Sequence, residues 1–488
     1  MRIRTPTDDH PVPLLADPAP QAAMFWHRGS TFSQAQVLGR IRALVAAFPA
    51  VGLAPFPAVG PWPFPAVGLA PNQQWVNLCL SRHAFMLTFC AALQHGYTNV
   101  LAADPSASTL QRLRRQHPNL RALSDDAARQ DVDLLITEAL WQSAQPSVAN
   151  NEISAALVAA LPFTSGSTGE PQAHPKRFGA MRLTADATER RLLSGWPRYS
   201  VLATVPSQHM YGLETTLMLA LGGRALVACE HPLLPADIAR ALAALPRPRV
   251  LVTTPVHLRA LTRSRDALPS ADRVLSATAP LATELAAQAE LRFGCEVHEI
   301  YGCTEAGSLA TRRTVEGDVW QLLDGYQMHA LDTSNSMLSA QVTGPQLLAP
   351  VVLPDRIECR DSERFRLLGR HEDVVNVAGK RASLAHLNQL LLQVEGVLDG
   401  LIYVPSDAVD ESARLRGLVV TNGRTERDVL RSLARVMDAV FLPRPLRVVS
   451  AIPRNATGKV TRAVIEALAQ RRASTKAGRA DPNEEGPI

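Results

Sequence analysis

Residues 163–171 of this 488-residue chain are Phe163-Thr164-Ser165-Gly166-Ser167-Thr168-Gly169-Glu170-Pro171. The apolar run 157–163 leads into this stretch and is strand-like, so the glycines and hydroxyls fall in the loop that follows. Glycine permits tight turns, and the backbone amides of such a turn can surround phosphate oxygens. The stretch does not match G-x-x-x-x-G-K-[ST], which excludes the common nucleoside-triphosphatase loop. By itself it fits either a phosphate-binding loop or an unspecialised serine-glycine loop.

Three further stretches follow this loop in the chain. They are Tyr301-Gly302-Cys303-Thr304-Glu305, Leu368-Gly369-Arg370-His371-Glu372-Asp373 and Pro453-Arg454-Asn455-Ala456-Thr457-Gly458-Lys459. In this order the four stretches resemble the motifs of the adenylate-forming superfamily, which includes acyl-CoA synthetases, aryl-acid ligases and peptide-synthetase adenylation domains. The resemblance covers about residues 31–468. It implies that a carboxylate attacks ATP, pyrophosphate leaves, and the acyl-adenylate passes to a second nucleophile.

Strand-like and helix-like segments alternate along most of the chain, which predicts an α/β fold with layered sheets. Helical spacing of apolar residues covers 33–48 and 84–94, and further helical segments lie at 235–245 and 281–293. Strand-like runs lie at 76–80, 99–102, 133–136, 201–205, 225–228, 250–253 and 273–276. After residue 308 the strands become shorter and more irregular. Beyond 370 the pattern is that of a small α+β unit.

We therefore expect residues 1–369 to form a large N-terminal domain of several subdomains, and residues 370–470 to form a small, mobile C-terminal domain. The polar residues 471–488 are expected to be a disordered tail. Residues 48–71 hold three near copies of a proline-rich octad, which excludes helix and sheet ladders there. The octads are either a partner site or a tandem duplication that lengthened a surface loop, a change that costs little free energy.

Composition narrows the class of protein further. Fifty Lys and Arg residues against 45 Asp and Glu residues give a net charge of +5, too small to indicate nucleic-acid binding. None of the six cysteines belongs to a C-x-x-C pair, so reduced thiols are expected rather than a zinc ribbon. The first residues lack the apolar core of a signal peptide, and the apolar run 84–93 is too short to span a bilayer. We expect a cytoplasmic protein without an integral membrane segment.

The resemblance assigns the triphosphate to the first loop, where the β- and γ-phosphates of ATP would meet Thr164, Ser165, Gly166, Ser167, Thr168 and Gly169. Superfamily members usually continue with Pro-Lys-Gly, but this chain has Pro171-Gln172-Ala173. Lys176 follows shortly after Gln172, and its long flexible side chain could reach the triphosphate instead.

The other motifs supply the remaining nucleotide contacts and the catalytic groups that the resemblance implies. Thr304 would bond the α-phosphate, and Glu305 would hold Mg²⁺, which prefers hard oxygen ligands. Lys459 would bridge the attacking carboxylate and the α-phosphate as charge develops, in a loop that Arg454 helps to shape. The others are Tyr301 at the adenine, Asp355 and Arg370 at the ribose, Glu372 at the domain hinge, and Gly379 beside the pantetheine tunnel.

The acid is expected to lie near Pro206-Ser207-Gln208-His209-Met210-Tyr211-Gly212. The resemblance places His209 at the carboxylate pocket, although a histidine satisfied within the core would fit the pattern too. No aspartate that could pair with a substrate amine occurs between 201 and 212. The stretch 276–281 resembles Ser-Gly-Gly-Ala-Pro-Leu, with Ala277 and Thr278 in place of the glycines. These larger residues narrow the site and favour a small or flat acyl group.

The sequence thus predicts an ATP- and Mg²⁺-dependent acid–thiol ligase that acts on a small carboxylic acid of the aryl or fatty type. Its acceptor is either CoA or a phosphopantetheinyl carrier protein, which present the same thiol arm. The His174-Pro175-Lys176 variant is similar to ligases of aryl-polyene (xanthomonadin-type) pigment pathways. The alternatives are an amino-acid-activating adenylation domain, a luciferase-like oxidative use of the adenylate, and a degenerate, non-catalytic nucleotide-binding or scaffold protein.

Overall fold

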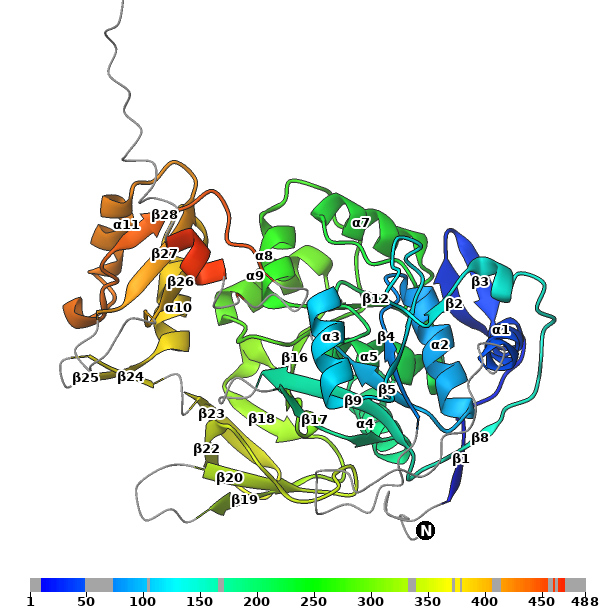
Figure 1. Cartoon of the computed structure of the whole chain (residues 1–488). Helices are drawn as coiled ribbons and strands as arrows, with labels where there is room; N and C mark the ends of the chain where they lie inside the picture. The colour runs from blue at the N-terminus through cyan, green and yellow to red at the C-terminus, as the bar shows by residue number, and fades with distance from the viewer. Residues whose placement is uncertain are drawn as a thin grey trace, which may run out of the picture. The chain divides into compact units, whose positions relative to one another are not determined.

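The structure is a computed structural model that describes residues 10–48, 73–102, 106–165, 171–331, 339–370, 374–377, 380–405, 414–454, 460 and 464–469. The chain divides into two compact units, one of Met1–Leu353 with Ile357–Leu367 and one of Pro354–Arg356 with Leu368–Ile488 (Figure 1). The longer part of the second unit begins at Leu368, two residues before residue 370, where the C-terminal domain was expected to begin. The octads beyond Phe48 and the expected tail 471–488 lie outside the described residues.

Within the described residues, the first unit is built around an eleven-stranded sheet of order β22-β23-β18-β17-β16-β15-β14-β12-β13-β2-β3. Neighbouring strands from β16 to β2 run parallel, and β3 and β17 pair antiparallel with the two ends of this parallel part. The strands are β2 Ala23–His27, β3 Ser30–Ser33, β12 Tyr199–Ala203, β13 Ala225–Ala228, β14 Arg249–Thr253, β15 Arg273–Ser276, β16 Val297–Cys303, β17 Gly307–Arg313, β18 Val319–Leu322, β22 Asp355–Cys359 and β23 Arg364–Arg370.

Helices cover both faces of the parallel strands, because successive side chains of a strand point to opposite faces. On β14, Val250 and Val252 join one buried cluster, whereas Leu251 joins another. The first cluster includes residues of α4 Phe178–Leu193, α5 Met210–Leu213, the π-helical segment Glu214–Met218 and α6 Leu219–Leu221. The second cluster includes residues of α7 Pro235–Ala244, α8 Pro255–Arg263 and α9 Thr283–Phe293. The predicted layered α/β fold is confirmed, with the expected helices at 235–245 and 281–293 in place.

A second sheet of the same unit has the order β10-β9-β5-β4-β6-β7, and β11 also pairs with β9. Trp75 of β4 packs into the cluster that contains α2, and Val76 packs with α3 on the opposite face. The elements are β4 Gln74–Asn77, α2 Arg82–Gln94, β5 Thr98–Leu101, α3 Ala107–Gln116, β6 Arg121–Ser124, β7 Leu134–Leu135, β9 Val158–Ser165, β10 Pro171–Ala173 and β11 Lys176–Arg177.

Two elements of the first unit begin or end at residues other than those expected from the sequence. The strand expected at 76–80 stops at Asn77, because the Asn77 side chain accepts from the backbone N–H of Cys79 at 3.2 Å and turns the chain. The helix expected at 33–48 is α1 Gln34–Ala47, which starts at a capping box between Ser33 and Gln36.

The remaining strands of the first unit are short. They are β1 Pro11–Pro13, β8 Glu152–Ser154, β19 Gln327–Leu331, β20 Ser339–Thr343 and β21 Val351–Val352, with 3₁₀ turns at Glu138–Leu140 and Thr314–Glu316. The expectation that strands become shorter after residue 308 is wrong, because β19, β20 and β22 have five residues each and β23 has seven.

The second unit has a core of its own, as an α+β unit requires. Its elements are β24 Val374–Val377, β25 Lys380–Ser383, α10 Leu384–Gln393, β26 Val397–Tyr403, β27 Arg416–Thr421, α11 Glu426–Leu433, a 3₁₀ turn at Ala439–Phe441 and β28 Leu446–Val448. An ion pair of 2.7 Å between Arg454 Nη2 and Asp399 Oδ1 fixes the chain just before the expected lysine loop.

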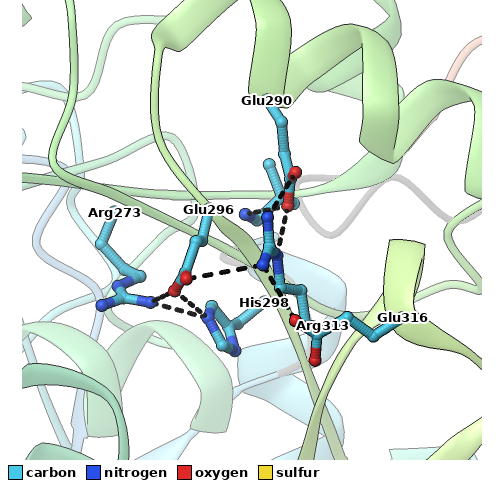
Figure 2. A network of polar contacts seen from close by, with 7 residues as sticks. Arg273, Glu290, Glu296, His298, Arg313 and Glu316 are labelled. Atoms are coloured by element: carbon cyan, nitrogen blue, oxygen red, sulfur yellow. Dashed lines mark hydrogen bonds and ion pairs between the residues drawn. The ribbon is translucent and has the colours of Figure 1, made fainter.

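A polar network joins α9 to the strands β15, β16 and β17, and Figure 2 shows it from close by. Arg313 pairs with Glu290 of α9 at 2.9 Å and with Glu296 at 3.5 Å. Glu296 also contacts Arg273 and lies 3.0 Å from His298 Nε2. Burial alone would raise the pKa of Glu290, but Arg313 and the N–H of Val297 outweigh it and lower that pKa. The network therefore stabilises the first unit most when its carboxylates are ionised.

Candidate active site

Three parallel strands of the large sheet end at one edge, and each is followed by a segment expected to carry the site. Residues 204–212 follow β12, residues 277–281 follow β15, and Thr304 with Glu305 follows β16. Carboxyl ends of parallel strands lie at the same edge of a sheet, which is where ligands bind in open α/β sheets. The fold thus gathers motifs that are up to about a hundred residues apart in the sequence.

Thr304 and Glu305 lie in the tight turn between β16 and β17. Cys303 pairs with Gly307 across this hairpin, so only residues 304–306 form the connection. A Cβ on Gly302 would lie 2.3 Å from the carbonyl oxygen of Gly307, so glycine is required at that position. The turn therefore places Thr304 and Glu305 at the edge of the sheet.

Tyr301 packs on the aromatic side chains next to this hairpin. Its ring centroid lies 5.7 Å from that of Trp320 and 5.7 Å from that of Phe365. Beyond it in the same strand, Cys303 is partly buried, and this burial raises the pKa of its thiol to about 12. The cysteine is therefore a neutral packing residue at physiological pH rather than a nucleophile.

Lys176 connects the first loop to this turn. Its Nζ donates a hydrogen bond of 2.5 Å to the backbone carbonyl of Glu305, and its side chain is buried. His174 Nε2 lies 3.9 Å from Glu305 Oε1. Burial lowers the pKa of Lys176, while Glu214, Cys303 and Glu305 act against that shift. In this structure the lysine thus supports the backbone of the Thr304–Glu305 turn.

The segment that carries His209 is also tightly constrained. A Cβ on Gly212 would lie 2.0 Å from the carbonyl oxygen of Pro206, so the loop closes on itself only with glycine there. His209 has extended backbone and directly precedes α5. Tyr211 donates from its hydroxyl to the carbonyl of Leu275 at 2.9 Å, which sets its ring beside the end of β15. The segment that carries His209 and the end of β15 are therefore neighbours.

Two unusual residues, Ser276 and Thr278, lie at the end of β15 and just after it. Thr278 has a φ of +80°, a left-handed conformation that β-branched residues rarely adopt. The threonine thus keeps the backbone shape of a glycine while carrying a side chain. Ser276 is fully buried, and its hydroxyl has no hydrogen-bond partner among the residues that the structure describes. A buried hydroxyl in this state is available to a ligand or a water molecule.

Several expected site residues cannot be placed. Gly166, Ser167, Thr168, Gly169, Glu372, Gly379 and Lys459 lie outside the described residues. Thr164 and Ser165 end β9, and Arg370 ends β23, but the description covers only their backbone. Gln172 of β10 stands opposite Thr164 of β9, so the first loop joins these two strands. Asp355 starts β22 and groups with the second unit.

The chemistry of the turn fits Mg²⁺ bound together with a nucleotide. Among the described residues, no group of three or more His, Cys, Asp or Glu side chains could hold a metal ion alone. Mg²⁺ usually binds through one or two carboxylates and substrate phosphates, and it retains water. The Glu305 side chain is 37% exposed, so its carboxylate is accessible for such an arrangement.

Two buried charged residues near the site were not predicted from the sequence. Arg82 begins α2 and donates to the carbonyls of Ala203 and Val205, just before the His209 segment. Glu214 follows α5 and accepts hydrogen bonds from Ser308, just after the Thr304–Glu305 turn. Both occur within apolar helical stretches, and their partners are more than 90 residues away. No local pattern could have identified them.

Comparison with known proteins agrees with this geometry. The family model described as "AMP-binding enzyme" matches residues 77–344. A 4-coumarate–CoA ligase of Halorhodospira halophila is 32% identical over 308 residues, which cover 61% of this chain and 73% of that protein. A second one, from Rhodobacter capsulatus, is 30% identical over 303 residues, or 61% of this chain and 73% of that protein. A p-hydroxybenzoic acid–AMP ligase of Mycobacterium marinum is 25% identical and covers 62% of this chain and 48% of its own length.

Solved structures show the same fold over almost the whole chain. The o-succinylbenzoate–CoA synthetase of Bacillus subtilis, in complex with AMP, superposes with a TM-score of 0.74 at 15% identity. That match covers 91% of this chain and 95% of the synthetase. A benzoate–CoA ligase of Burkholderia xenovorans gives a TM-score of 0.69 at 17% identity, over 91% of this chain and 96% of that one.

Proposed function

Because the chain belongs to the AMP-binding enzyme family, we propose that it is an ATP-dependent ligase that joins a carboxylic acid to a thiol. The reaction forms an acyl-adenylate with release of pyrophosphate, and the thiol then displaces AMP. The observation that carries this proposal is the convergence of the His209 segment, the end of β15 and the Thr304–Glu305 turn at one sheet edge. An acid and the α-phosphate of ATP must meet at such a place for the first step to occur.

The roles of individual residues follow from their positions in this arrangement. Thr304 donates to the α-phosphate, and Glu305 binds the Mg²⁺ of ATP·Mg²⁺. When bound, Mg²⁺ neutralises phosphate charge. His209 lines the pocket of the acid's carboxylate, and Tyr301 borders the adenine. Lys459 offsets the charge that develops on the α-phosphate oxygens.

Further contacts to ATP belong to the same proposal. The first loop, which includes Gly166, Ser167, Thr168 and Gly169, surrounds the triphosphate through its amides. Asp355 and Arg370 bind the ribose, and the second unit moves between the two half-reactions about Glu372. Gly379 then borders the pantetheine arm.

We infer that the acid is a flat aryl acid. Relatives named for 4-coumarate and p-hydroxybenzoic acid support this, as does the ring of Tyr211 beside the end of β15. Ala277 and Thr278, which stand where superfamily members usually have glycines, reduce the space available to a bulky acyl chain. A role in an aryl-polyene pathway agrees with this substrate class and stays a prediction.

CoA is the acceptor that the relatives' names support, and a phosphopantetheinyl carrier protein presents the same thiol. In the described part of the chain, no helix combines the length and apolar character that crossing a membrane requires. All six cysteines are free, and ATP, Mg²⁺ and CoA are abundant in the cytoplasm, where we place the protein.

The test is acid-dependent release of pyrophosphate from ATP·Mg²⁺ over a panel of aryl, short-chain, long-chain and amino acids. We expect turnover with one or more aryl acids, followed by thioester formation when CoA or a holo-carrier protein is added. Comparing these two acceptors on the same acyl-adenylate decides between them. ATP binding without turnover on any acid would refute the proposal and favour a non-catalytic nucleotide-binding protein. Turnover confined to amino acids would make the protein an adenylation domain instead.

A further inference from the structure

We propose that Glu214 is a positioning residue that, with Lys176, clamps the Thr304–Glu305 turn in the shape that binds ATP·Mg²⁺. This inference rests on the proposed function, because it concerns the same turn. Glu214 opens the π-helical segment Glu214–Met218, and its side chain is buried. π-Helical turns inside α-helices are rare and often occur at functional sites.

The carboxylate of Glu214 contacts the start of β17. Its Oε2 accepts 2.5 Å and 3.1 Å hydrogen bonds from the hydroxyl and the backbone N–H of Ser308. Its Oε1 lies 2.5 Å from where a Cβ on Gly307 would be, so the carboxylate is pressed against the backbone of the hairpin. Gly307 has a φ of +80°, which lets the chain leave the turn at this point. Glu214 therefore fixes the strand immediately after the turn.

Lys176 fixes a second point of the same turn, through its hydrogen bond to the carbonyl of Glu305. One anion and one cation, each buried and each from a different element, thus hold residues 305–308. Burial raises the pKa of Glu214, whereas Ser308 and the charge of Lys176 act to lower it. Each of the two buried charges compensates part of the desolvation cost of the other.

Glu214 also connects the turn to the acid-binding segment. His209, Tyr211 and Glu214 lie within six consecutive residues, so α5 and the π-helical segment carry the acid pocket at one end and the clamp at the other. Thr215 reinforces this piece by donating from its hydroxyl to the carbonyl of Tyr211 at 2.5 Å. A shift of this segment on acid binding would move the carboxylate that holds the turn.

The clamp can be tested without turnover by calorimetry. The binding of the β,γ-imido analogue of ATP is measured at a series of Mg²⁺ concentrations. For Glu214→Ala we expect the Mg²⁺ concentration at half-saturation to rise about tenfold, equal to about 1.4 kcal/mol. Glu214→Gln should shift it less, because the amide oxygen still accepts from Ser308. Ser308→Ala should shift it in the same direction, and its effect should not add to that of Glu214→Ala.

Glu189 offers a matched control. It is a buried carboxylate of α4 that accepts a 2.6 Å hydrogen bond from the Tyr199 hydroxyl, away from the hairpin turn. Glu189→Ala should lower the melting temperature comparably and leave the Mg²⁺ titration unchanged. A Glu214→Ala shift no larger than that of Glu189→Ala would overturn the inference. If Glu214→Ala does not fold, Glu214→Gln and Ser308→Ala carry the same comparison against Glu189→Gln.

Activity separates this inference from the proposed function. With an active acid, Glu214→Ala should raise the KM for ATP·Mg²⁺ and leave the KM for the acid within about twofold, an effect well under 1.4 kcal/mol. A wild-type protein that binds the analogue with Mg²⁺ but releases no pyrophosphate would refute the proposed function. In that case the calorimetric titration would still decide whether Glu214 positions the turn.

Discussion

Replacing Arg82 with methionine tests whether one buried guanidinium holds the sheet edge on which the site is built. Nη1 of Arg82 donates to the carbonyls of Ala228 at 3.1 Å and Glu230 at 2.9 Å. Nη2 donates to the carbonyls of Ala203 at 3.0 Å and Val205 at 2.7 Å. The side chain thereby ties the ends of β12 and β13 to the start of α2.

The expected loss of stability follows from these contacts. Burial lowers the pKa of Arg82 to about 10, so the group is still charged at neutral pH. A hydrogen bond to a charged group contributes about 1.5–3 kcal/mol, which gives about 6–12 kcal/mol for four bonds. Desolvation of the buried cation opposes this by several kcal/mol. Methionine fills a similar volume but leaves four carbonyls without a donor, so we expect a net loss of about 3–5 kcal/mol.

Denaturant unfolding followed by tryptophan fluorescence measures this loss for the first unit. Arg28→Met is the control, because the Arg28 side chain is 73% exposed and its ion pair with Glu138 lies in solvent. That variant should change stability by less than about 0.5 kcal/mol. Arg82→Met should also raise the KM for the acid, since the segment that carries His209 follows Val205. An Arg82→Met protein within about 0.5 kcal/mol of wild type would refute the reasoning.

Three further outcomes are expected. Lys459→Ala should slow adenylation by about 100- to 1,000-fold, which is the loss typical of removing one group that stabilises developing charge. The same variant should still form the thioester from a supplied acyl-adenylate. Equal adenylation rates for the variant and the wild type would disprove the catalytic role. Thr278→Gly should stabilise the first unit by up to about 1 kcal/mol, because relief of the left-handed strain exceeds the entropy that glycine adds to the unfolded chain; a lower denaturation midpoint would contradict this. The depressed pKa of Glu290 contributes stability that is present above its unfolded pKa of about 4.3 and is lost as the pH falls through the folded value. The melting temperature should therefore fall less between pH 7 and pH 4 for Arg313→Ala than for the wild type. An equal fall in both proteins would show that Arg313 does not lower the pKa of Glu290.

The sequence was sufficient for the fold because apolar periodicity is a local property. The alternation of strands and helices predicted the layered sheets, and the ends of β12, β15 and β16 coincide with the motifs singled out in advance. The error at β4 arose from a side chain, since Asn77 turns the chain where apolar residues would allow the strand to continue. Such competition between side chain and backbone is invisible to a hydrophobic pattern.

The candidate site was predictable only in part, because its supporting contacts are tertiary. Thr304, Glu305 and His209 belong to short motifs, so they could be named from the sequence. Lys176 could be named as well, but not its contact with the Glu305 carbonyl, which depends on how β11 meets the hairpin. Glu214 lies in a helical run of apolar residues and acquires a partner only when β17 is brought beside it.

Burying a charge at this edge costs several kcal/mol in desolvation, which the hydrogen bonds of the side chain must offset. Each of these side chains contacts backbone or a hydroxyl at a strand end or a turn, where the hydrogen bonds of the β-sheet end. They are Arg82, Lys176 and Glu214. Strand ends have unpaired backbone groups, and an apolar side chain there could not fix their direction. Charged side chains can, because their hydrogen bonds are strong and directional. A site that must orient a triphosphate and an acid within one turn of backbone therefore gains precision from these charges.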